Sequence, residues 1–118
     1  MARERSDSAA LFDMLQAAEA ILRHIAGRTR DDYEREELLR HAVERNIEII
    51  GEAARRLSAE FRDRHPHIPW RSNVATRHIL AHEYDEVDND IVWRIVTDHI
   101  PVLIQQLHPF LPPPPETT

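Results

Sequence analysis

The chain has 118 residues, the length of a single domain, and its formal net charge is −6 because 21 acidic residues outnumber 15 basic ones. This charge argues against broad, sequence-independent binding of nucleic acid, but it leaves room for a small cleft lined by Arg, since the chain has no Lys. The absence of Cys excludes disulfides and thiolate metal sites, and the sequence shows neither a membrane span nor a signal peptide, so we expect a cytoplasmic protein without membrane contact.

Apolar residues recur with the 3.6-residue period of a helix in several segments, which predicts four main helices and a short extra one. The main helices are expected over residues 11–25, 31–57, 70–81 and 89–107, and the short one begins near Ser58. We expect Ser6 or Ser8 to cap the first helix and Gly27 to end it. Pro101 is expected to kink the last helix, because a proline inside a helix removes a backbone hydrogen bond.

No segment alternates between apolar and polar residues, so we predict an all-α fold without a sheet. Four main helices with short connections favour an up-and-down helical bundle. We assign residues 1–108 to this bundle and residues 109–118 to an extended Pro-rich tail. The apolar face of the last helix is wider than one bundle core requires, which indicates a dimer formed through helices.

The densest group of chemically useful side chains lies at the end of the third predicted helix and in the turn after it. It contains a cation, two imidazoles, two carboxylates and a phenol, from Arg77, His78, His82, Glu83, Tyr84 and Asp85. Imidazole exchanges a proton near neutral pH and the planar Arg fork matches two phosphate oxygens, so the set suits RNA cleavage by the 2′-hydroxyl. Five helical residues advance about 500°, so Arg77 and His82 converge only if the helix ends near His82 and the chain turns.

The spacing between Arg and His is not specific by itself. Arg followed by His after four to six residues occurs five times in the chain, whereas its composition gives about three by chance. The pair Arg77/His82 differs from the others because Tyr84 follows it and because it ends a predicted helix ahead of a turn.

Two other interpretations of the same residues stay open. His78 and His82 stand four residues apart on one helix face, and an acidic residue within 83–86 could complete a metal site. In the structural interpretation, Arg77 pairs with a neighbouring carboxylate, His82 caps the helix end, and Tyr84 packs with its hydroxyl bonded.

The extended pattern Arg77-x4-His82-x-Tyr84 resembles the signature of HEPN-domain toxins of the HepT type. The likeness covers about residues 8–108, and His78 departs from the family, which often has Asn at that place. Similar blocks occur at residues 49–54, 68–70, 80–84, 87–88 and 91–93.

This resemblance implies an all-α HEPN bundle that forms a homodimer and places two Arg-x4-His motifs in a shared cleft. It implies a metal-independent endoribonuclease toxin without a cofactor, which cleaves tRNA or mRNA and is neutralised by a nucleotidyltransferase antitoxin of the MntA type. Arg77 would stabilise the scissile phosphate and His82 would act in acid–base catalysis, with His78 and Glu83 in support. Tyr84 would receive AMP from the antitoxin, and the added charge would block the place of the RNA phosphate.

The alternative to the toxin is a non-catalytic HEPN module that only docks a nucleotidyltransferase partner. Elsewhere in the chain, Trp70 and Trp93 are expected to be core or interface aromatics. The pairs Arg55-Arg56 and Arg62/Arg64 are expected on solvated helix faces, with contact to phosphates at the edge of a cleft as the alternative.

Overall fold

The computed structural model describes residues 2–70 and 88–110, and within them every regular element is a helix, which confirms the all-α fold class. None of these helices is long and apolar enough to cross a membrane. The third predicted helix, apart from Trp70, lies outside the described residues. The elements are α1 (Ala2–Ile25), α2 (Arg30–Arg35), α3 (Glu37–Arg56), α4 (Ala59–Arg64), α6 (Asn89–Arg94), the π-helical turn η1 (Ile95–His99), α7 (Ile100–Leu107) and the 3₁₀ turn η2 (His108–Phe110).

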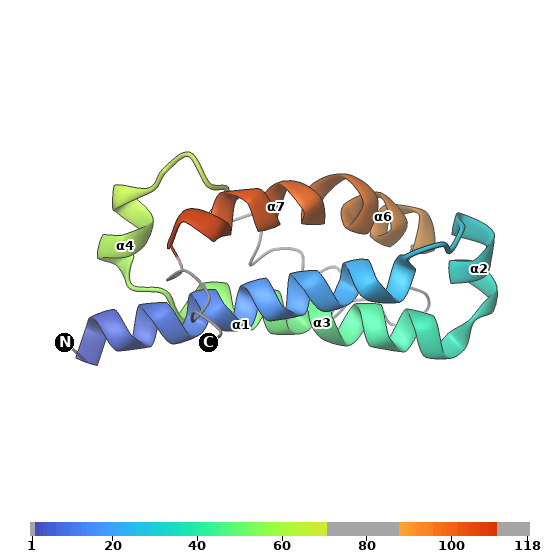
Figure 1. The fold of residues 1–118 in the computed structure, drawn as a ribbon, viewed down its shortest axis with the longest axis horizontal. Helices are drawn as coiled ribbons and strands as arrows, with labels where there is room; N and C mark the ends of the chain where they lie inside the picture. The colour runs from blue at the N-terminus through green and yellow to red at the C-terminus, as the bar shows by residue number, and fades with distance from the viewer. Residues whose placement is uncertain (1, 71–87, 111–118) are drawn as a thin grey trace, which may run out of the picture.

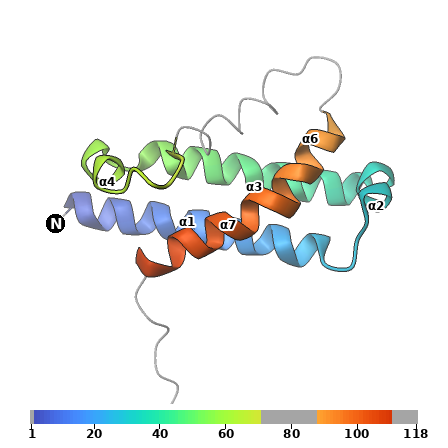
Figure 2. The same ribbon diagram turned by 90° about the horizontal axis from the view of Figure 1, so that it is seen from above.

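The described helices form two layers. The long helices α1 and α3 lie side by side and antiparallel in one layer, and α6 and α7 cross over them in the other (Figure 1). Seen from above, the second layer runs diagonally across the long pair (Figure 2). The short helix α2 lies at one end of the long pair, beside the start of α6, and α4 lies at the opposite end, where α7 finishes.

The start of α1 differs from the prediction, and its end agrees with it. Neither Ser6 nor Ser8 caps the helix, because α1 begins at Ala2 and both serines lie within it. The buried carboxylate of Asp7 accepts hydrogen bonds from the backbone N–H and the hydroxyl of Ser58, both at 2.8 Å, so a tertiary contact supports these first turns. At the other end Gly27 adopts φ +73°, the left-handed conformation that ends helices, as predicted.

The helix predicted over residues 31–57 is divided in two at Glu36, whose backbone is extended (φ −98°, ψ 100°). The division lets the short helix α2 turn the fully buried ring of Tyr33 into the core. The carbonyls left at the end of α2 find a donor from farther along the chain, since the Arg40 guanidinium donates to the carbonyls of Tyr33 and Glu34. The short helix predicted from Ser58 is confirmed as α4, with the Ser58 hydroxyl accepting from the N–H of Phe61 at 3.1 Å.

The last predicted helix has the expected limits, and its irregularity takes the form of a π-helical turn. In η1 the N–H of Ile100 donates to the carbonyl of Ile95, five residues back. Pro101 follows directly, has no N–H, and its ring would clash with the carbonyl of Thr97 in a regular α-helix. The wider turn before Pro101 therefore absorbs the proline without ending the helix.

The core is built from the apolar residues that recur with helical periodicity. Leu39 is buried, whereas its neighbour Leu38 is 85% exposed, because the start of α3 turns only Leu39 inward. The buried side chains of the two layers include Leu11, Met14, Ala18, Ile21, Val43, Ile47, Ile50, Val92, Val96, Ile100, Leu103 and Leu107. Trp70 is buried and Trp93 packs against the core, as expected for core aromatics.

Candidate functional site

The residues predicted to carry the chemistry all fall within residues 71–87, outside the part of the chain that the structure describes. These residues are Arg77, His78, His82, Glu83 and Tyr84. Their arrangement and roles therefore stay predictions. The structure does describe both flanks of this segment, the stretch that ends at Trp70 and the stretch that resumes at Asp88.

An aromatic cluster holds the upstream flank in place. The ring of Phe61, in α4, lies 4.6 Å from the ring of His65, and Phe110 of η2 lies 4.5 Å from the same imidazole, so the imidazole contacts two phenyl rings. Trp70 packs edge-on against Phe61 at 5.8 Å, and its indole N–H donates to the His65 carbonyl at 3.0 Å. The chain that leads into residue 71 is thus fixed to both α4 and the end of the last helix.

The environment of His65 favours its neutral form. Partial burial lowers the pKa of this imidazole, and the nearby positive groups of His67 and Arg64 lower the same pKa further. The phenyl rings of Phe61 and Phe110 lie against the imidazole and shield it from water, which explains why burial lowers its pKa.

A hollow of about 530 Å³ lies beside α4 and the loop after it. Its apolar surface comes from two buried residues, Ile68 and Trp70, and from two exposed prolines, Pro66 and Pro69. Ala59, Arg62 and Asp63 complete the lining. The half-buried Arg62 has a shielded Nε that donates no hydrogen bond, and its guanidinium forms no ion pair with any residue in the described ranges.

The downstream flank is held to α2 by a group of charged and polar side chains. Asp88 caps α6, accepting from the N–H groups of Asp90 at 2.9 Å and Ile91 at 3.3 Å. Arg30 of α2 pairs with Asp90 at 2.5 Å and with Glu34 at 2.7 Å, and Asn89 donates to Glu34 at 3.1 Å. The chain that follows residue 87 therefore starts from a fixed position at the α2 end of the molecule.

These contacts shift the pKa values of the groups that make them. The hydrogen bond to Asp90 is the largest factor that raises the pKa of Arg30. Hydrogen bonds from Asn89 and then Arg30 lower the pKa of Glu34. Both shifts favour the charged forms, so the ion pairs persist across neutral pH.

Beside this group lies an aromatic pair, the buried Tyr33 and the partly buried Trp93. The ring of Tyr33 packs 5.7 Å from that of Trp93, and the Tyr33 side chain has no exposed surface. Burial raises the pKa of the Tyr33 hydroxyl, which has no hydrogen-bond partner among the residues that the structure describes. Sequence reasoning missed Tyr33 because its partners lie far away in the chain.

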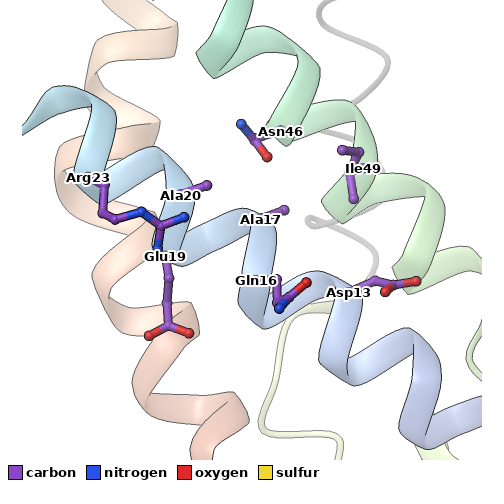
Figure 3. A pocket seen from close by; sticks show the side chains of 8 residues that line it. All are labelled: Asp13, Gln16, Ala17, Glu19, Ala20, Arg23, Asn46 and Ile49. Atoms are coloured by element: carbon purple, nitrogen blue, oxygen red, sulfur yellow. The ribbon is translucent and has the colours of Figure 1, made fainter.

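A second hollow of about 440 Å³ lies between α1 and α3 (Figure 3). Figure 3 shows Gln16 and Asp13 of α1 and Asn46 and Ile49 of α3 around this space. Asp13 already pairs with Arg56 at 2.7 Å, and no His lines the hollow, so it lacks a group that exchanges protons near neutral pH. We therefore do not regard it as the candidate active site.

No group of three or more His, Asp or Glu side chains within residues 2–70 and 88–110 is arranged to hold a metal ion. The alternative metal site at His78 and His82 lies outside those residues, so the structure does not test it.

Comparison with known proteins identifies the family of the chain. The pattern of the family called Ribonuclease HepT-like matches residues 14–110. The chain belongs to the ribonuclease HepT-like family. This match spans both flanks and the whole of the segment between them, and it confirms the resemblance noted in the sequence.

Individual relatives agree with this assignment. "Putative RNase MJ1380" of Methanocaldococcus jannaschii is 32% identical over 104 residues, which are 88% of this chain and 95% of that protein. "Putative RNase TTE0752" of Caldanaerobacter subterraneus is 35% identical over 101 residues, 86% of this chain and 90% of the relative. "Probable ribonuclease HepT" of Thermococcus cleftensis is 35% identical over 100 residues, 85% of this chain and 91% of the relative. No solved structure matches the chain at a significant level.

Proposed function

We propose that this HepT-like protein is a metal-independent endoribonuclease that acts as the toxin of a toxin–antitoxin pair. The observation that carries the proposal is the family match over residues 14–110, which includes the pattern Arg77-x4-His82-x-Tyr84. Relatives that are named as RNases or as a ribonuclease match this chain over nearly their whole length, and these names support the same reaction class.

The proposed reaction is attack of an RNA 2′-oxygen on the adjacent phosphorus. The new P–O2′ bond forms while the bond from phosphorus to the 5′-oxygen breaks, the 2′-hydroxyl loses a proton, and the leaving 5′-oxygen gains one. His82 moves a proton in this exchange, because imidazole changes protonation state near neutral pH. Arg77 stabilises the negative charge that builds on the phosphate oxygens in the transition state.

We propose that a nucleotidyltransferase antitoxin neutralises the toxin by transferring AMP from ATP to Tyr84: the Tyr84 oxygen loses its proton and bonds to the α-phosphorus, and pyrophosphate leaves. The new phosphodiester carries a negative charge and a bulky nucleoside two residues from His82, where both hinder an incoming RNA phosphate. The proposed active form is a homodimer in the cytoplasm. Large apolar side chains left exposed on the second layer, Ile91 at 42% and Val102 at 47%, support association with a second copy.

A cleavage assay tests the reaction. Purified protein is incubated with RNA in the presence of EDTA, beside the variants Arg77→Ala and Arg94→Ala. Arg94 is the matched control, because it also precedes a His by five positions and is exposed on α6. We expect the unaltered chain to cleave RNA at the same rate with and without EDTA. Cleavage should disappear in Arg77→Ala and persist in Arg94→Ala.

Other outcomes point elsewhere. Cleavage abolished by EDTA would favour the metal site at His78 and His82, and equal cleavage by both variants would indicate a contaminating nuclease. If no preparation cleaves RNA but the chain still binds a nucleotidyltransferase, the non-catalytic docking module would be correct.

The modification is tested by mass spectrometry. With the nucleotidyltransferase partner and ATP present, the mass of the chain should rise in steps of one AMP, and Tyr84→Phe should abolish the rise. The chain has one other tyrosine, the buried Tyr33, so Tyr33→Phe is the control and should leave the modification unchanged. AMP addition that persists in Tyr84→Phe would refute the assignment.

A further inference from the structure

The hollow beside α4 holds a combination of groups that the proposed reaction does not use. Its floor is apolar, formed by Ile68 and Trp70, which are 2% and 5% exposed. Its polar side chains are one cation, Arg62, and one carboxylate, Asp63. The indole N–H of Trp70 is already bonded to the His65 carbonyl, so among these side chains Arg62 is the donor left for a ligand.

Arg62 is in an unusual state for an arginine. Its Nε is shielded from solvent and donates to no group, although an unmet buried donor carries a desolvation cost. The ordinary use of a free guanidinium fork is to donate two parallel hydrogen bonds to a phosphate or carboxylate. If the guanidinium turns toward a phosphate in the hollow, a phosphate oxygen can accept a hydrogen bond from the Nε. The phosphate also supplies a negative charge that pairs with the cation.

The hollow is also rigid before any ligand arrives. Pro66 and Pro69 fix two backbone torsions in its wall. The N–H of Ile68 donates to the carbonyl of His65 at 3.2 Å, and the N–H of Trp70 donates to the carbonyl of Ile68 at 2.8 Å. These two hydrogen bonds close two tight turns. A preformed wall lowers the entropy lost on binding, which suits a site that grips a flat ligand.

We propose that this hollow is a subsite for one nucleotide of the RNA substrate, outside the bond that is cleaved. The Arg62 guanidinium binds its phosphate, the apolar wall of Pro66 and Pro69 packs against its base, and Asp63 accepts a hydrogen bond from an amino group of that base. This inference rests on the proposed ribonuclease function.

The position and charge of the hollow favour RNA over an acidic peptide. Trp70 precedes Arg77 by seven residues, a length of chain that reaches at most about 25 Å, which a short single strand can bridge. A chain with net charge −6 needs local cations to hold RNA, and Arg62 is one that no described carboxylate neutralises. Asp63 at the same site accepts hydrogen bonds, which the amino groups of a nucleobase can donate and the side-chain carboxylates of an acidic peptide cannot.

Binding is measured on the full chain with His82→Gln, so that RNA stays intact whether or not the wild type cleaves it. The probe is a labelled single-stranded RNA of about ten nucleotides, followed by fluorescence anisotropy. Arg62→Ala should weaken binding about tenfold and reduce the slope of log K against log salt by about one, and Arg62→Lys should fall between. Arg64→Ala is the matched control, an exposed arginine two residues on that does not line the hollow, and should change Kd less than threefold.

A second readout locates the nucleotide. In a Trp93→Phe background, Trp70 is the sole tryptophan, so RNA bound in the hollow should shift its emission, and the shift should vanish with Arg62→Ala. Equal losses in Arg62→Ala and Arg64→Ala, or binding without any change in Trp70 emission, would overturn the proposal. Displacement of the RNA by a glutamate-rich peptide would also overturn the proposal. The same holds if free AMP shifts the Trp70 emission as strongly as RNA does at equal nucleotide concentration.

The two proposals fail in different ways. If the ribonuclease proposal is wrong, the unaltered chain cleaves RNA no faster than Arg77→Ala does. The binding test can still be interpreted in that case, because it does not depend on cleavage. If cleavage occurs, Arg62→Ala should raise KM several-fold and leave kcat unchanged, as expected for a group that binds substrate away from the reacting atoms. A fall in kcat with constant KM would contradict a subsite.

Discussion

The contact between Asp7 and Ser58 joins the start of α1 to the start of α4, and replacing Asp7 with Ala should destabilise the protein strongly. Asp7 is 7% exposed, and its carboxylate accepts two hydrogen bonds of 2.8 Å, from the N–H and the hydroxyl of Ser58. Hydrogen bonds to charged groups contribute about 1.5–3 kcal/mol each, and because the two bonds share one carboxylate we expect a total loss of about 2–4 kcal/mol. For a chain of this length that loss lowers Tm by roughly 8–16 °C.

Thermal unfolding followed by circular dichroism measures this effect. The matched control is Asp13→Ala, which removes the ion pair with Arg56 between side chains that are 42% and 49% exposed. An exposed pair contributes at most about 1 kcal/mol, so Tm should change by no more than roughly 4 °C. A double-mutant cycle with Ser58→Ala should give a coupling energy of at least about 1 kcal/mol. Equal losses in Asp7→Ala and Asp13→Ala, or a coupling near zero, would refute the reasoning.

Three further predictions follow from single residues. Gly27→Ala should cost about 1 kcal/mol in chemical denaturation, because an added Cβ meets no atom there and only the positive φ opposes it; Gly27→Asn should cost less, and equal costs would contradict this cause. Tyr33→Phe should stabilise the fold by up to about 1 kcal/mol, since it removes a buried hydroxyl without a described partner, and a loss of stability would show that the hydroxyl is bonded. Because the pKa of His65 is lowered by folding, the imidazole binds a proton more tightly in the unfolded chain than in the folded one. The contribution of His65 to the free energy of unfolding is therefore complete above pH 6.5 and is lost as pH falls through the folded-state pKa. Between pH 7.5 and pH 5 the Tm of His65→Phe should therefore fall less than that of the unaltered chain, whereas an equal fall in both would count against the shift.

The elements set by local chemistry were predictable from the sequence. Gly27 ends α1 through its own backbone freedom, and Ser58 starts α4 through its own hydroxyl, so each acts within a few residues. Pro101 disturbs the last helix where expected, but whether the helix kinks or widens into a π-helical turn depends on how its neighbours pack.

The features set by distant contacts were not predictable in the same way. The break at Glu36 follows from burial of Tyr33 beside Trp93, which is sixty residues away in the chain, and from Arg40 reaching back to the carbonyls of α2. The start of α1 depends likewise on Ser58. The hollow beside α4 requires the fold of residues 65–70, so sequence alone placed Arg62 on a solvated face, with a phosphate contact only as an alternative.

In the proposed reaction, proton transfer depends on the imidazole of His82. The most direct measurement is the single-turnover rate of RNA cleavage by His82→Ala, beside His41→Ala, which removes an exposed imidazole of α3. Loss of a group that moves a proton in the transition state lowers the rate by about 100-fold or more, so His82→Ala should fall by that factor while His41→Ala cleaves as the unaltered chain does. A His82→Ala rate within about threefold of the unaltered rate, a far smaller loss than proton transfer predicts, would contradict the proposed active site.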